Sequence, residues 1–127
     1  MTVGLDDSGD TLRQIENDVT DLTFSTPRGV QDWTGVNSSA NERGLLLADF
    51  QASVTGVFND AALTGIHTVI KDIGSNSATR GFSIVHSGQT LSNECVATDQ
   101  QWSRAGTGEL TVVVPLQLNS TTVPTWS

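Results

Sequence analysis

Hydrophobic and polar positions alternate through the middle of the chain. From Ala48 to Phe58 the even positions are apolar or small. The odd positions from Asp49 to Thr55 are polar, and the next odd position is Val57. A period of two is typical of a β-strand with one buried and one solvated face. Together with the residues from Gly44 onward, the pattern predicts one unusually long strand that ends in a turn at Asn59–Asp60.

After this turn the spacing of apolar residues changes from two to three or four, which is typical of an amphipathic helix. Asp60 is a suitable N-cap and Gly74 a suitable stop, so the helix is expected between them. The apolar stripe consists of Ala62, Leu63, Ile66, Val69, Ile70 and Ile73.

Other segments also have strand character and are separated by turn-forming residues. The clearest is Glu109–Asn119, in which Pro115 lacks a donor and so favours a strand that is at an edge or faces a partner at that point. A turn is expected at Pro27–Gly29 and a loose polar tail at Ser120–Ser127, apart from Val123 and Trp126. The remaining strand candidates are Thr2–Asp6, Thr11–Phe24 with an interruption at Glu16–Asp18, Val30–Val36, Arg80–His86 and Thr90–Arg104.

These elements predict a mainly β protein with a single domain spanning residues 1–127. The expected architecture is an antiparallel β-sandwich or half-barrel with one α-helix packed on its apolar side. A strand as long as the central one, polar along a whole side, exceeds what a small domain needs to close its own core. It therefore suggests that this side forms a wall.

Composition narrows the range of functions. The chain has 127 residues, of which 14 are acidic and 6 basic, giving a formal net charge of -8. Binding nucleic acid by neutralising phosphates needs clustered Lys and Arg, which are missing here. A single cysteine excludes an internal disulfide and fits a reducing cytoplasm. No secretory signal or membrane-spanning run is visible in the sequence.

Residues able to do chemistry are few and scattered. They are His67, His86, Cys95, the pair Asp6–Asp7 and the pair Asp18 and Asp21. Neither histidine has metal-ligand spacing, and the acidic pairs lack the spacing of a calcium loop. Cys95, between Glu94 and Val96, is expected to pack as a small apolar side chain. The sequence thus predicts no enzyme activity, no metal and no cofactor, and favours action through surfaces.

Four segments, taken in order, carry a resemblance to a known family. They are VGLDDSGDTLRQIENDVTDLTF, WTGVNSSANERGLLLADFQASVTGVFNDAA, TGIHTVIKDI and NECVATDQQWSRAGTGELTVVVPLQLN. Each segment is degenerate by itself, and the ordered set, which covers nearly the whole chain, is more specific. It resembles the tail tube (major tail) proteins of bacteriophages with long, non-contractile tails. Pro115 and the short C-terminal tail depart from the family pattern, and the second suggests an undecorated tube.

The resemblance implies a β-sandwich subunit that assembles into six-membered rings, whose sheets form a ring-shaped β-barrel. The rings would stack into a hollow tube around a tape measure protein and meet tail terminator and tip proteins. The subunit would be made in the host cytoplasm and reside in the virion tail. Genomic DNA would pass through without specific binding, and neither catalysis nor membrane contact is implied.

A tube of this kind assigns roles to particular residues. Asp49 is the lone charge on the polar side of the central strand and is expected to face the bore, with Asp99 and Glu109 as further candidates. Like charge in the bore would let DNA slide rather than stick. The polar segment from Ser25 to Arg43 is expected to contact the neighbouring ring through Trp33, Asn37 and Arg43.

Three other functions remain open from sequence. A tube protein of a contractile tail or a type VI secretion system would share the fold. A virion decoration or adhesin module would show exposed aromatic residues on loops, of which this chain has few. An enzyme would need a constellation of reactive groups, and none is visible.

Overall fold

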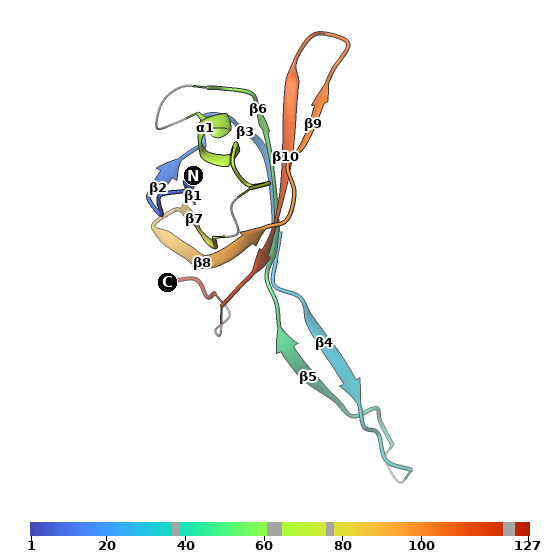
Figure 1. Ribbon diagram of the computed structural model, residues 1–127. Coiled ribbons are helices and arrows are strands. Elements are labelled where there is room, and N and C mark those ends of the chain that lie inside the picture. Colours follow the sequence, from blue (N-terminus) through green and yellow to red (C-terminus); the bar gives the residue numbers. More distant parts are fainter. Residues whose placement is uncertain (37–38, 61–64, 76–77, 121–123) are drawn as a thin grey trace.

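A computed structural model of the chain describes residues 1–36, 39–60, 65–75, 78–120 and 124–127. These residues contain ten strands and one short helix (Figure 1). The elements are β1 (Thr2–Asp6), β2 (Leu12–Gln14), β3 (Val19–Ser25), β4 (Arg28–Asp32), β5 (Arg43–Ala48), β6 (Gln51–Val57), α1 (Ile66–Ile70), β7 (Arg80–His86), β8 (Gln89–Ala97), β9 (Gln101–Arg104) and β10 (Leu110–Leu118).

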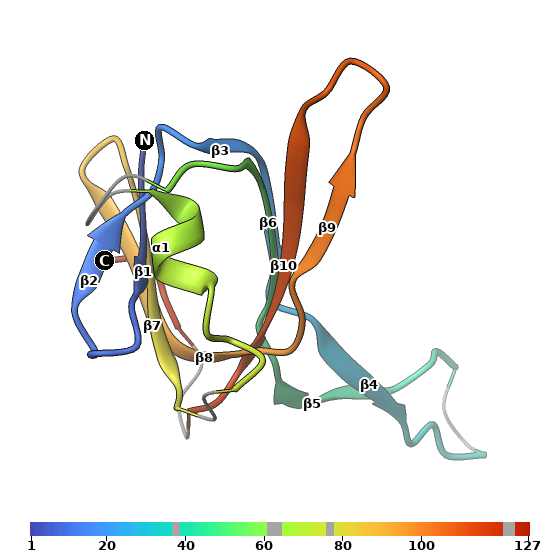
Figure 2. The same ribbon diagram turned by 45° about the horizontal axis from the view of Figure 1, so that its top comes forward.

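Eight of the strands form one antiparallel sheet in the order β2-β1-β7-β8-β10-β6-β3, and β9 adds to β10. The sheet curls so that the β1–β7–β8 wall faces the β10–β6–β3 wall, and α1 lies across the opening between them (Figures 1 and 2). The predicted class is therefore confirmed, as a half-barrel with one helix on its concave side. Among the described strands, the order is open and the sheet does not close into a barrel.

The core fills the space between these two walls. The predicted alternation is confirmed from Asp49 to Val54, because Phe50, Ala52 and Val54 are buried, whereas Asp49 and Gln51 are exposed and Ser53 is half-buried. The neighbouring strand β10, the other wall, α1 and the chain after β2 supply the rest of the core. Its members outside β6 are Val3, Leu5, Ile15, Ile66, Val69, Ile70, Phe82, Ile84, Leu91, Cys95, Val112, Val114 and Leu116.

The prediction of one unbroken strand from Gly44 to Phe58 is wrong. The strand divides at Asp49 and Phe50, between β5 and β6. The Asp49 amide donates to the Pro27 carbonyl at 2.9 Å, and the Asp49 carboxylate accepts from the Phe50 amide at 2.7 Å. These bonds replace the ladder where the chain passes from one sheet into the other.

The prediction of a helix capped by Asp60 is also wrong. The helix α1 begins after Gly65, which makes no side-chain cap, and ends at Ile70. A carboxylate distant in sequence takes the capping role, because Asp18 Oδ2 accepts from the Ile66 amide at 3.1 Å. Its other oxygen accepts from Asn59 Nδ2 at 3.0 Å. The expected start of the helix, Ala62 and Leu63, lies outside the described residues.

Two further expectations about strands need correction. The predicted strand Thr90–Arg104 is two strands, β8 and β9, separated at residues 98–100. Pro115 lies in a central strand rather than at an edge, because β6 pairs with β10 on one side while β9 and β8 share the other. Pro115 sits where β10 changes partner from β9 to β8, so its missing donor breaks no ladder with either strand on that side.

The chain ends and turns also differ in places from expectation. Arg28 and Gly29, expected in a turn, belong to β4. The end of the tail is tied down, since Ser127 and Thr90 exchange backbone hydrogen bonds of 3.0 and 2.9 Å. Trp126 packs on Phe24 with ring centroids 6.0 Å apart.

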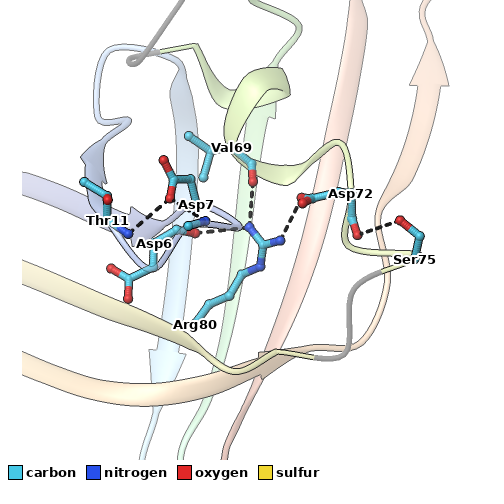
Figure 3. Close-up of polar contacts among 8 residues, drawn as sticks. Asp6, Asp7, Thr11, Val69, Asp72, Ser75 and Arg80 are labelled. Atoms are coloured by element: carbon cyan, nitrogen blue, oxygen red, sulfur yellow. Dashed lines mark hydrogen bonds and ion pairs between the residues drawn. The ribbon is translucent and has the colours of Figure 1, made fainter.

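A buried guanidinium fixes α1 against the sheet (Figure 3). Arg80 is 2% exposed and donates to the Asp6 carbonyl at 3.1 Å, the Val69 carbonyl at 2.6 Å and Asp72 Oδ1 at 2.8 Å. Partial burial opposes ionisation of Asp72, but hydrogen bonds from Arg80 and Ser8 lower its pKa overall. Three segments, β1, the end of α1 and β7, are thus joined at one side chain.

Replacing Arg80 by Ala should destabilise the fold strongly, because two carbonyls and a carboxylate lose their donor. Removing one partner of a buried pair costs about 3–5 kcal/mol. Arg13→Ala is the matched control, since Arg13 and Asp7 form a pair with side chains 27% and 22% exposed. Such a pair contributes under about 1 kcal/mol. Urea unfolding of both variants tests this, and equal losses would contradict it.

Candidate assembly surfaces

One candidate surface is the side of β3, β6, β10 and β9 that points away from the core. We call it the polar face. The register places Thr23 beside Ser53 and Ser53 beside Pro115, so these side chains share one side of the sheet. The polar face consists of Asp21, Thr23, Ser25, Gln51, Ser53, Thr55, Val57, Gln101, Ser103, Thr111, Val113, Pro115 and Gln117. A shallow groove of about 360 Å³ lies over the part of this face where β3 ends and β6 begins.

The polar face is rich in hydroxyl and amide groups and poor in charge. Asp21 is the one charged residue in the set, all of which the structure describes. Its position beside Thr55 follows a register shift between Val19 and Asp21. Sequence reasoning did not select Asp21 as a residue of this face, although Asp21, Thr23 and Ser25 alternate with the apolar Leu22 and Phe24.

The three acids proposed from sequence for the bore lie at strand ends and are not brought together. Asp49 lies between β5 and β6. Asp99 lies between β8 and β9, where it accepts from the Gln100 amide at 2.7 Å and from Gln101 Nε2 at 3.1 Å. Glu109 immediately precedes β10, and its carbonyl accepts from the Ala105 amide at 2.9 Å. Their facing the bore of a tube stays a prediction.

The second candidate surface is a hairpin that leaves the main sheet, formed by β4, β5 and the loop between them. We call residues 28–48 the arm. It projects well away from the half-barrel (Figures 1 and 2). It contains six of the eleven large apolar side chains that are exposed among the described residues. The six are Val30, Trp33, Val36, Leu45, Leu46 and Leu47.

The two sides of the arm differ. On one side Val30 and Leu45 stand directly opposite each other. On the other, Leu46 and Trp33 lie over glycines. A Cβ at Gly29 would come within 3.0 Å of Leu46 Cδ1, and one at Gly44 would overlap the Trp33 ring. Glycine at both positions therefore lets large side chains lie flat on the backbone.

Polar contacts hold the shape of the arm. Arg28 donates from Nε and Nη2 to the Leu46 carbonyl at 3.0 and 2.9 Å, at the register shift in the β4–β5 pairing. Toward the tip, Asp32 Oδ1 accepts from the Thr34 amide at 3.0 Å and from its hydroxyl at 2.6 Å. These bonds lower the pKa of Asp32. The arm is thus a formed hairpin with apolar side chains in solvent.

The residues predicted to contact a neighbouring ring fall in the arm as far as they are described. Trp33 follows β4 and is 57% exposed, and Arg43 begins β5 opposite Asp32. Asn37 lies outside the described residues. The leucines Leu45 to Leu47 were missed as surface residues, because three consecutive apolar residues next to a strand pattern suggest a core.

The reactive residues do not assemble into a catalytic site. His67 packs between Phe58 and Trp102, with ring centroids 4.7 and 5.8 Å away. Asp7 pairs with Arg13, and hydrogen bonds from Arg13 and Thr11 lower its pKa. Within the described part of the chain, no three His, Cys, Asp or Glu side chains gather as metal ligands. Nor does any helix there have the length and apolar character needed to span a membrane.

Cys95 is fully buried, and its thiol donates to Asn93 Oδ1 at 3.2 Å. Burial, with a smaller effect of the neighbouring Glu94, raises its pKa to about 12. The thiolate is the reactive form, so this environment opposes nucleophilic chemistry. Packing as a small apolar residue, the role expected from sequence, agrees with this position.

Comparison with solved structures places the fold among chains of tail-bearing particles. Over 97% of this chain and 95% of the other, the fold matches a chain of the virion of a native gene transfer agent particle, with a TM-score of 0.75 and 16% identity. It matches a chain from the C6-symmetric tail of an empty gene transfer agent particle with a TM-score of 0.71 and 18% identity, over 100% and 93%.

A third match is a chain of the anti-feeding prophage baseplate, with a TM-score of 0.61 and 8% identity over 99% and 91% of the two chains. At these identities the likeness establishes the fold. No family model matches the sequence, and no curated protein sequence does.

In the folded protein Cys95 should react with a thiol reagent at pH 8 at least about a thousandfold more slowly than in the unfolded chain. The rise of its pKa from 9.0 to about 12 reduces the thiolate fraction by that factor. Reaction with a chromogenic disulfide, with and without denaturant, measures the ratio. Rapid modification without denaturant would contradict the buried placement.

Proposed function

We propose that this chain is the repeating subunit of a phage-like tail tube. The observation that carries the proposal is the arm, a formed hairpin with large apolar side chains on both sides and no core of its own. An isolated two-stranded hairpin is marginally stable in water, and exposed apolar patches mark interaction sites. Leu47, 94% exposed, contributes nothing to the monomer core. A surface of this kind serves contact with another molecule.

A second copy of the same chain is the partner that the fold favours. Chains of this fold occur in a C6-symmetric tail, which is an assembly of many copies. The subunit would form rings, with hexamers as the expected size, and the arm would join one ring to the next. The tube would thus be a structural component of the tail that forms by self-association of the subunit, without a catalytic step.

The polar face is the surface we assign to the bore of the tube. Its hydroxyl and amide groups hold water, and Asp21 adds a carboxylate to each subunit. The net charge is -8, so the chain has few basic side chains with which to bind phosphates. Asp49, Asp99 and Glu109 would add negative charge near the ends of this surface. The tape measure protein and then genomic DNA would pass along it without specific binding.

A tube of a contractile injection system is the second candidate, favoured by the match to the anti-feeding prophage baseplate. Both candidates use the same subunit surfaces. They differ in whether a sheath binds the outside of the tube. A sheath gene beside this one would favour the contractile system, and the absence of a sheath from purified tails would favour the non-contractile one.

Changing Leu45 and Leu47 to Asp should leave the subunit folded and abolish tubes. Both side chains are exposed in the monomer, yet burying each in an interface would contribute about 1.5–3 kcal/mol. Leu12→Asp is the control, because Leu12 is exposed on β2, outside the arm. Electron microscopy and thermal unfolding measure the two properties. Normal tubes from the double variant would refute the assignment of the arm.

Changing Thr23 to Lys should slow DNA release from particles built with the variant, most at low salt. Each ring would gain one ammonium group per subunit facing the phosphates, and such contacts weaken as salt rises. Ser92→Lys, at an exposed position on β8 outside the polar face, is the control. Release is followed by dye fluorescence. Equal rates for the Thr23 variant and wild type at low salt would contradict the bore assignment.

A further inference from the structure

An apolar cluster lies at the end of β6 farthest from the arm. It consists of Phe58, His67, Trp102 and Leu110, and we call it the Phe58 cluster. The ring centroids of Phe58 lie 4.7 Å from His67 and 5.9 Å from Trp102. The Phe58 amide donates to the Leu110 carbonyl at 2.9 Å, which holds the end of β6 against the start of β10.

The rings of the Phe58 cluster pack on one another, yet part of the cluster is exposed to solvent. Phe58 continues the core side of β6, yet it lies past the strand end and is 43% exposed. Leu110 is 37% exposed. Trp102 uses its one donor on Gln100 Oε1 at 3.2 Å, so its ring offers only an apolar surface. The alternation along the central strand placed Phe58 on the core side, but its ring is exposed in this cluster, whereas His67 is half-buried.

The arm and the Phe58 cluster lie at opposite ends of the same two strands. The arm leaves the main sheet after Ser25 and returns before Gln51, whereas Val19 and Val57 mark the far ends of β3 and β6. Seven residues of β6 separate the two surfaces, about 23 Å of extended chain. Figure 1 shows the arm and the end of β6 pointing in opposite directions along the molecule.

We propose that the Phe58 cluster of one subunit is the docking site for the arm of the subunit in the next ring. The aliphatic residues Val30, Leu45 and Leu47 would pack against the open faces of Phe58, Trp102 and Leu110. The inference rests on the proposed tube and adds the surface that receives the arm. Two different surfaces at opposite ends form a heterologous contact, which repeats without closing and so builds a filament.

An arm-to-arm contact is the competing arrangement, because β4 and β5 each have an unpaired outer edge among the described residues. Two arms paired by a two-fold axis would close after two subunits. That contact would leave the Phe58 cluster in water. A chain of this fold occurs in a tail with helical and C6 symmetry. Such a tail requires a contact between subunits that repeats along its axis.

Cross-linking between singly substituted subunits tests the docking site. Leu47→Cys and Leu110→Cys proteins are mixed in equal amounts, assembled and treated with a short bis-maleimide. Peptide mass spectrometry then identifies which thiols are joined. Cys95 stays unreactive, since it is buried with a pKa of about 12. A mixture of Leu47→Cys with Leu12→Cys is the control for random collision.

The expected product joins the thiol introduced at position 47 of one subunit to the thiol introduced at position 110 of another. It forms in assembled tubes and is absent from dilute monomers. Two results in assembled tubes would overturn the docking site while leaving the tube proposal standing. One is that the only product joins two copies of position 47. The other is that the control mixture yields as much product between positions 47 and 12 as the test mixture yields between positions 47 and 110. Wild-type protein that forms no tubes at any concentration would overturn the proposed function itself.

Discussion

The pairing of β3 with β6 determines where both candidate surfaces of the molecule lie. These two strands form part of the wall around the core and then continue, through short breaks, into β4 and β5 of the arm. The same hairpin is therefore half inside a folded domain and half in solvent. Because the core closes without the arm, the arm is free to carry apolar side chains that the monomer does not use. The β3–β6 pairing also carries the polar face, so a single pair of strands sets the position of both surfaces.

Two buried polar groups keep the small core in register. Asp18 selects where α1 begins, and Arg80 fixes where it ends against β1 and β7. A helix of five residues has little stability of its own, and tertiary contacts must supply it. The hydrogen-bond partners of both groups lie outside the arm. This separation is what allows the arm to be changed without unfolding the domain.

Sequence patterns predicted the elements whose causes are local. The alternation within Ala48–Phe58 indicated β6, and the strand pattern of Glu109–Asn119 indicated β10. The break at Asp49 and the capping by Asp18 depend on partners distant in the chain, so no local pattern marks them. The leucines Leu45–Leu47 were the most misleading. Their composition suits a core, and only the position of the arm outside the sheet shows that they face solvent. Alternation along the central strand singled out Asp49 as a residue of the bore, and the structure places Asp49, Asp99 and Glu109 just outside the strands, so their facing the bore stays a prediction.

A tube built from copies of this chain is the proposal from which the roles of the arm and the polar face follow. Negative-stain electron microscopy of the purified wild-type protein at high concentration tests it without any substitution. Hollow tubes are expected, with six subunits visible in end views of single rings. Featureless monomers at every concentration, with the fold intact by circular dichroism, would contradict it.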